Sequence, residues 1–341
     1  MLPSLLVVDD PSFDEHRAVG EHPERPERLY AARRAVDRIA SRATLIPIPA
    51  RPASDDELAR VHTPAYIEAL GQSAGKRGHL DEDTYLAPAS AAASRRAAGG
   101  AVDLVSALLD GRATRGVALL RPPGHHARPS GAMGFCLLNN VAIAALHARA
   151  HGAERVLIVD FDVHHGNGTQ ETFYADPSVA FVSLHQFPFY PGTGDTGETG
   201  AGDGRGLTVN VPLSAGADDA VYAAAFSRLV APVASEFAPS LVLLSAGFDA
   251  HRDDPLAEML LTDVAYGSMM NALTRALPAG TPVGMLLEGG YDLAALEASL
   301  AAALGALLEP SGAEAPGPPV APRHEVELAR AVATARQFWH L

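Results

Sequence analysis

The sequence has 341 residues, of which 48% are hydrophobic, and a formal net charge of −14. This length and apolar content allow a large buried core and exclude widespread disorder, while the acidic balance argues against nucleic acid as a partner. No apolar run approaches the ~18 residues of a membrane-spanning helix, and the single cysteine, Cys136, excludes an internal disulfide and suits a reducing, cytoplasmic compartment.

The predicted elements alternate between short apolar strands and longer helices. The first residues carry a short apolar run and no basic segment, so we expect a strand there and not a signal peptide. Ser54 and Glu57 have the spacing of a capping box, which predicts that an early helix begins at this point. Further along the chain, hydrophobic periodicity predicts strands at 116–120, 155–160, 179–185, 207–213, 241–247 and 282–290, and helices at 139–152, 218–237, 262–277 and 293–308.

This alternation of strands and helices indicates βαβ units. We predict an α/β fold in three layers (αβα), with a mostly parallel sheet covered by helices on both faces. One domain is expected over residues 1–308, followed by a Pro/Gly-rich linker at 309–323 and a helical tail at 324–341. Phe338 and Trp339 are expected to dock this tail on the body of the domain.

Titratable or glycine-rich residues follow almost every predicted strand. Because ligands bind beyond the carboxyl ends of the strands in parallel α/β sheets, these residues are expected to converge on one site. In chain order they are His125 and His126; Asp160, Asp162, His164 and His165; His185; Asp249; and Glu288, Gly289, Gly290 and Tyr291.

The stretch "DFDVHHGNG" predicts a metal site. Alternation along an extended segment directs Asp160, Asp162 and His164 to one face. With Asp249 as a third ligand, two carboxylates and one imidazole would leave positions open for water and substrate, as in catalytic zinc sites. Arginase-like enzymes place carboxylates for a second metal at two further positions, held here by Gly166 and His251. We therefore predict a single transition metal.

With the metal ligands assigned elsewhere, the adjacent His125 and His126 are available to transfer protons. Tyr291 follows two glycines, which allow its hydroxyl to be placed above the metal. A phenol there could donate to a developing oxyanion.

Several long motifs, in order, resemble the zinc-dependent histone deacetylase superfamily. The resemblance covers about residues 5–305, and the motif forms are similar to the class II branch and to bacterial histone deacetylase-like and acetylpolyamine amidohydrolases. It implies the arginase/deacetylase fold and makes 1–308 a deacetylase catalytic domain. The motifs are "GEHPERPERL", "RPPGHHA", "GFCLLNNVAIA", "DFDVHHGNGTQ", "VSLHQFPFYPGTGD", "LSAGFDAHRDDPL" and "LEGGYDL".

The resemblance implies a role for each matching residue. Zinc would be held by Asp162, His164 and Asp249, with His125 and His126 as base and acid and Tyr291 as oxyanion donor. A structural potassium ion would be bound by Asp160, Asp162, His164, Ser183 and Leu184, and a second one near Phe173, Asp176 and Val179. The acyl-lysine channel would be lined by Gly134, Phe135 and Tyr190, with Leu256 at its mouth.

Two of the channel residues, Tyr190 and Leu256, give opposite indications of which acylated amine is the substrate. Tyr190 stands where lysine deacetylases usually carry Phe and polyamine deacetylases carry Tyr, whereas Leu256 stands where polyamine-selective members carry an acidic residue. An acetylated lysine of a peptide or protein is the favoured substrate, with an acetylpolyamine or another small amide as the alternative. A catalytically weak acyl-lysine-binding protein is the alternative from a different class. The predicted tail helix could also pack between subunits of a homo-oligomer.

Overall fold

The computed structural model describes residues 2–311 and 319–341. Its centre is an eight-stranded sheet with the order β2-β1-β5-β10-β9-β6-β7-β8, in which every neighbouring pair is parallel. The strands are β1 (Ser4–Val8), β2 (Thr44–Ile48), β5 (Arg115–Ala118), β6 (Val156–Asp160), β7 (Val179–Gln186), β8 (Thr208–Leu213), β9 (Leu241–Ala246) and β10 (Val283–Leu287).

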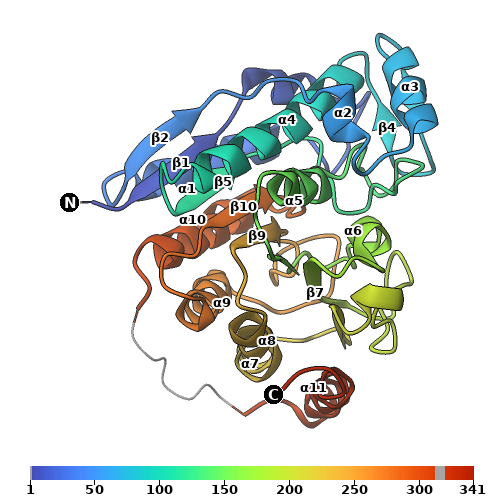
Figure 1. The fold of residues 1–341 in the computed structure, drawn as a ribbon. Helices are drawn as coiled ribbons and strands as arrows, with labels where there is room; N and C mark the ends of the chain where they lie inside the picture. The colour runs from blue at the N-terminus through green and yellow to red at the C-terminus, as the bar shows by residue number, and fades with distance from the viewer. Residues whose placement is uncertain (1, 312–318) are drawn as a thin grey trace.

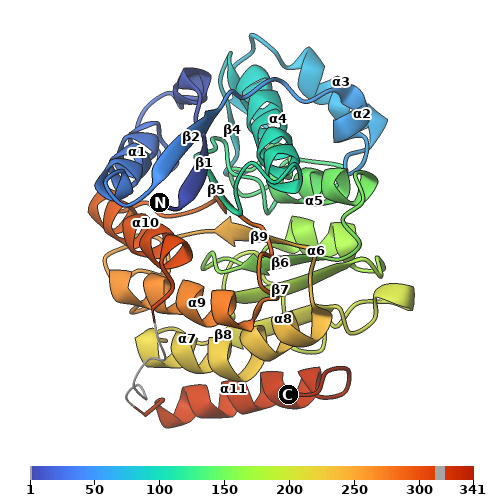
Figure 2. The same cartoon turned by 60° about the vertical axis from the view of Figure 1, so that its left-hand side comes forward.

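Helices cover both faces of this sheet (Figures 1 and 2). One face carries α4, α5 and α6, and the other carries α1, α10, α9, α7 and α8, which confirms the predicted three-layer α/β fold. The helices are α1 (Glu27–Ile39), α2 (Asp55–Leu58), α3 (Pro64–Gln72), α4 (Ser90–Leu109), α5 (Asn140–Ala150), α6 (Asn167–Phe173), α7 (Asp219–Ala225), α8 (Ala231–Phe237), α9 (Asp263–Ala276), α10 (Leu293–Leu308) and α11 (Pro322–Ala335).

The central strands β6, β7, β9 and β10 are buried along their whole length. Their continuous apolar sequence is therefore explained by helices on both sides. The helix predicted over 218–237 consists of α7 and α8, joined by a π-helical turn at Phe226–Val230.

Polar side chains fix where several helices begin. The Ser54 side chain accepts from the backbone of Glu57 and the Glu57 carboxylate accepts from the backbone of Ser54, so the predicted capping box is present. The helix that it opens, α2, is only four residues long. Asn139 caps α5 by accepting from Ala142 N at 3.0 Å, directly behind the loop that carries the paired histidines.

A short antiparallel hairpin stands at the carboxyl edge of the sheet, formed by β3 (Gly78–His79) and β4 (Tyr85–Leu86). Lys76, the only lysine in the sequence, is exposed two residues before β3. Asp81 holds the turn of the hairpin by accepting from the backbone N–H groups of Asp83 and Thr84.

The last helix, α11, packs on the edge strand β8 and on α7. It begins at Pro322, so Pro322 and Arg323, predicted to belong to the linker, instead form its first turn. Proline is favoured there because its missing N–H has no helical partner in any case. Residues 312–318 of the predicted linker lie outside the described residues. Within the described residues, no helix combines the length and apolar character needed to cross a bilayer.

Candidate metal centre and active site

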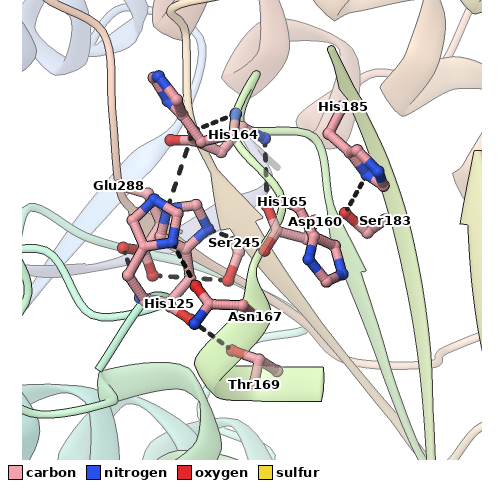
Figure 3. A network of polar contacts seen from close by, with 12 residues as sticks. His125, Asp160, His164, His165, Asn167, Thr169, Ser183, His185, Ser245 and Glu288 are labelled. Carbon is pink, nitrogen blue, oxygen red and sulfur yellow. Dashed lines mark hydrogen bonds and ion pairs between the residues drawn. The ribbon is translucent and has the colours of Figure 1, made fainter. Parts of the chain in front are cut away.

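The predicted site residues gather beyond the carboxyl ends of adjacent strands (Figure 3). Asp160 is the last residue of β6, Asp249 follows β9, Glu288 follows β10, and the two histidines follow β5. Because β5, β10, β9 and β6 are consecutive in the sheet, these residues meet although up to 163 positions separate them in sequence, from His125 to Glu288.

Asp162, His164 and Asp249 form a compact group whose ligand atoms all lie within 4.8 Å of one another. His164 Nδ1 lies 3.2 Å from Asp162 Oδ1 and 3.2 Å from Asp249 Oδ2. Both carboxylates are fully buried, and they lie against backbone: a Cβ at Gly247 would be 2.1 Å from Asp162 Oδ2, and one at Gly289 would be 2.2 Å from Asp249 Oδ2. The two glycines therefore allow the carboxylates to converge.

The charge of this group fits a divalent cation. Burial and the neighbouring Asp162 raise the pKa of the Asp249 carboxyl to about 7, because two buried negative charges so close together repel each other. A bound cation removes that repulsion. Two carboxylates and one imidazole are a donor set that zinc accepts in catalytic sites. This chain therefore has suitable residues for the predicted zinc.

One other cluster among the described residues has metal-ligand spacing, and it consists of His125, Cys136 and Glu288. Burial raises the pKa of the Cys136 thiol well above its ordinary value, so the thiol stays protonated and is a poor ligand. Glu288 is engaged elsewhere, because its carboxylate accepts from the backbone N–H groups of Gly124 and His125. This cluster holds the histidine loop against β10 and is the weaker metal candidate.

The paired histidines have different partners. The rings of His125 and His126 are 4.0 Å apart, but His125 Nδ1 lies 3.0 Å from a carboxylate oxygen of Asp160, whereas His126 Nδ1 lies 2.7 Å from the amide oxygen of Asn167. Burial lowers the pKa of His125, but the carboxylates of Asp160 and Asp162 outweigh burial and raise it to about 10. Burial and the adjacent His125 lower the pKa of His126 well below its ordinary value. These surroundings favour the cationic form of His125 and the neutral form of His126.

Tyr291 is held from two sides. Asp254 Oδ2 accepts from the backbone N–H of Tyr291 at 2.7 Å. Arg28, fully buried in α1, donates to the backbone oxygens of Gly290 (2.7 Å) and Glu288, and its guanidinium lies 5.0 Å from the centroid of the tyrosine ring. Neither Arg28 nor Asp254 was foreseen as part of the site. The motif "GEHPERPERL" contains Arg28, and it was the only sequence signal for this contact.

A narrow cavity of about 100 Å³ opens above these groups. Its wall contains the two histidines, His164, Tyr291 and all four residues predicted for the substrate channel. Tyr190 packs edge-on against His126, with ring centroids 5.3 Å apart. The complete lining is Asp83, Pro123, His125, His126, Gly134, Phe135, Cys136, His164, Tyr190, Leu256, Gly289 and Tyr291.

The residues predicted to bind potassium lie behind the metal group. Asp160 and Ser183 are directly opposed on the neighbouring strands β6 and β7, and Leu184 is the next residue of β7. Phe173, Asp176 and Val179 occupy the connection between α6 and β7, where Asp176 N donates to Phe173 O at 3.1 Å. Both sets are compact, and the potassium ions themselves stay a prediction.

The parallel α/β fold and the buried group of two aspartates and one histidine together place the protein in the class of α/β metallohydrolases. A model of the histone deacetylase domain matches residues 22–307, and the chain belongs to the histone deacetylase family. The crystal structure titled HDA15 HD domain superimposes with a TM-score of 0.92 at 41% sequence identity, covering 99% of this chain and 95% of that one.

Curated relatives agree with this assignment. Histone deacetylase 15 of Arabidopsis thaliana is 46% identical over 84% of this chain, and the human polyamine deacetylase HDAC10 is 40% identical over 90% of it. The chain spans about half the length of these two proteins, 53% and 47% respectively. A probable deacetylase of Archaeoglobus fulgidus is 38% identical over 84% of this chain and 81% of its own length.

Proposed function

We propose that the protein is a zinc-dependent deacetylase that removes acetyl or related acyl groups from an amine, with the acetylated lysine side chain of a peptide or protein as its substrate. One observation carries this proposal: two adjacent buried histidines, one paired with the Asp160 carboxylate and the other with the Asn167 amide oxygen, stand at the wall of a narrow cavity, next to a buried metal-ligand group and a tyrosine hydroxyl. This arrangement suits the attack of water on an amide.

Zinc held by Asp162, His164 and Asp249 would polarise the acyl carbonyl and lower the pKa of a water toward about 7. His126 is the general base: its Nδ1–H donates to the Asn167 oxygen, which accepts only, so Nε2 is the basic nitrogen. Because the ring is neutral, it can take a proton from the attacking water.

His125 and Tyr291 stabilise the negative charge that develops on the substrate. The His125 ring lies beside His126. The histidine pair returns to the leaving amine the proton that His126 takes from water. Burial raises the pKa of the Tyr291 hydroxyl well above its ordinary value, and the nearby Arg28 offsets only part of that rise. The phenol therefore stays protonated and donates a hydrogen bond to the oxyanion.

The shape of the cavity favours an extended aliphatic amine as substrate. Phe135 and Tyr190 contribute aromatic walls, and Leu256 adds an apolar group. A linear acyl-lysine side chain would thread such a channel with its amide at the metal. We infer in addition that the two predicted potassium sites are filled, and turnover in potassium chloride compared with tetramethylammonium chloride tests this.

An acetylpolyamine is the second candidate, and one residue of the cavity wall favours it. Asp83 lies in the cavity wall together with Tyr190, so a carboxylate stands where a second cationic nitrogen could enter. The similarity to HDAC10, which is described as a polyamine deacetylase, points the same way. Leu256 in the same wall offers no charge to a polyamine, which is why the lysine substrate is preferred.

The deciding experiment compares kcat/KM on an acetyl-lysine peptide and on acetylspermidine, using zinc-loaded enzyme and the Asp249→Ala variant as blank. A preference of tenfold or more for the peptide, about 1.4 kcal/mol of transition-state discrimination, supports the lysine deacetylase. The same margin for the polyamine supports the second candidate. Binding of acylated ligands without turnover above the blank would leave only a binding protein and end the proposal.

A further inference from the structure

The loop between β7 and β8, residues 187–207, brings two aromatic rings to the site. The Phe189 ring stacks on that of His164 with centroids 5.5 Å apart and planes at 22°. The Tyr190 ring stands edge-on to both His126 and His164, at 5.3 and 6.2 Å. The conformation of this loop therefore determines one wall of the cavity.

Buried polar groups hold the inner side of this loop. His185 Nε2 lies 3.0 Å from the carbonyl oxygen of Gly194, and His165 Nδ1 lies 2.7 Å from Thr193 Oγ1. A Cβ at Gly194 would lie 2.4 Å from His185 Nε2, so the loop is pressed closely onto these rings. This side is anchored by the domain itself.

The outer side of the loop is held by α11. Arg330 makes a two-pronged contact with Asp195, 2.8 Å to Oδ1 and 3.0 Å to Oδ2, and Asp195 in turn accepts from Gly197 N. Just after the helix, Trp339 Nε1 donates to the carbonyl oxygen of Gly206 at 2.8 Å. Residues of α11 and of the segment after it therefore contact the loop at two places: Asp195, five residues after Tyr190, and Gly206, just before β8.

We infer that α11 is a positioning element of the channel, and that Arg330, through Asp195, holds the loop in the conformation that presents Phe189 and Tyr190 to the substrate. The helix lies outside residues 22–307 that match the deacetylase domain, so it adds a support to the channel wall beyond that matched range. Its kinetic consequence rests on the proposed deacetylase function.

The effect is on substrate binding and not on the chemical step. Arg330 does not line the cavity, whereas the loop that it holds carries a wall residue, Tyr190. An exposed ion pair contributes little to global stability, so its removal loosens the loop without unfolding the protein. His126 keeps its hydrogen bond to Asn167, and His164 keeps its contacts with Asp162 and Asp249, because none of these residues lies in the loop.

The test compares Arg330→Ala with Glu325→Ala. Glu325 is the matched control because it makes an equally exposed ion pair from α11, but with Arg228 in the π-helical turn and not with the loop. We expect Arg330→Ala to raise KM about three- to tenfold with kcat within twofold, Arg330→Lys to recover most of the loss, and Glu325→Ala to match wild type. Equal KM values for Arg330→Ala and Glu325→Ala would overturn the inference.

A second measurement does not depend on turnover. Amide hydrogen exchange across residues 187–206 should be faster in Arg330→Ala than in Glu325→Ala, and unchanged exchange there would also overturn the inference. If wild type failed to deacetylate any acylated amine, the proposed function would be wrong, while faster exchange would still establish the positioning role of Arg330.

Discussion

Neighbouring charges and burial shift the pKa values of the two adjacent histidines in opposite directions. His125 faces a carboxylate and His126 faces an amide oxygen. The carboxylates beside His125 and the burial of His126 next to it therefore support the proposal that His126 is the base. Because both residues are histidines, the sequence alone does not indicate which of them is the base.

Replacing Asn167 by Asp should move this balance. A carboxylate at 2.7 Å from His126 Nδ1 would raise the pKa of the ring. As the pH falls, the ring would therefore become protonated, and stop acting as a base, at a higher pH than in wild type. We expect the acid limb of the kcat/KM–pH profile to shift upward by about one unit or more, with the basic limb little changed. A superimposable profile for Asn167→Asp and wild type would show that His126 is not the base.

Removing the Tyr291 hydroxyl tests the oxyanion donor. Tyr291→Phe keeps the ring contact with Arg28 but has no proton to donate, so kcat should fall on the order of 10²-fold or more. Because Asp162, His164 and Asp249 are untouched, the zinc content of the purified variant should equal that of wild type. Full turnover in this variant would remove Tyr291 from the mechanism.

At the scale of elements, the N-terminus of α5 links several parts of the site. Asn139 caps this helix through Oδ1, while its Nδ2 donates to Ala127 O at 3.2 Å, directly after the histidine pair, and to Thr169 in α6 at 3.2 Å. One side chain therefore joins the histidine loop, α5 and α6. Its loss removes a helix cap and leaves a buried carbonyl without its partner.

Asn139→Ala should consequently lower the free energy of unfolding by about 2–4 kcal/mol, about 1 from the cap and the rest from the unpaired buried groups. Asp218→Ala is the matched comparison, because Asp218 caps α7 but its side chain joins no second element in this way. It should cost only about 1 kcal/mol. Urea unfolding of both variants measures the difference, and equal losses would contradict the linking role of Asn139.

The elements that could be predicted were those with long periodic sequence. The strands 155–160, 179–185 and 241–247 were placed almost to the residue, because runs of apolar residues buried on both faces have few alternatives. The hairpin at 78–86 and the π-helical turn at 226–230 could not be predicted, since neither leaves a periodic signal. The Asp and His metal ligands and the tyrosine donor could be predicted from their chemistry, whereas Arg28 acts through backbone oxygens that a sequence does not display.

At the scale of the whole molecule, folding buries histidines in neutral form. Burial lowers the pKa of His16 to about 3 and that of His62 to about 4, from an ordinary value of 6.5. Between about pH 4 and 6.5 these two rings therefore carry more protons in the unfolded chain than in the folded protein. The contribution of the two rings to the free energy of unfolding rises with pH across this window, is fully present above pH 6.5 and is lost as the pH falls.

Each of these two rings should contribute a slope of up to about 1.4 kcal/mol per pH unit within that window. Urea unfolding midpoints measured at pH 7.0, 5.5 and 4.5 should therefore decrease steeply. Replacing His62 by Gln removes one titrating ring and should make the decrease shallower. An unchanged slope in that variant would mean that His62 is already protonated in the folded protein.

The single lysine before the hairpin has a consequence of its own. Under the proposed activity on acylated lysines, this sequence offers one lysine side chain as a target for its own enzyme, Lys76, exposed two residues before β3 of the hairpin whose Asp83 lines the cavity. Acylation of lysine side chains in this sequence is therefore confined to Lys76. The same scarcity allows a fluorophore to be coupled to a single lysine side chain, on the segment that leads into the hairpin that contributes Asp83 to the cavity wall.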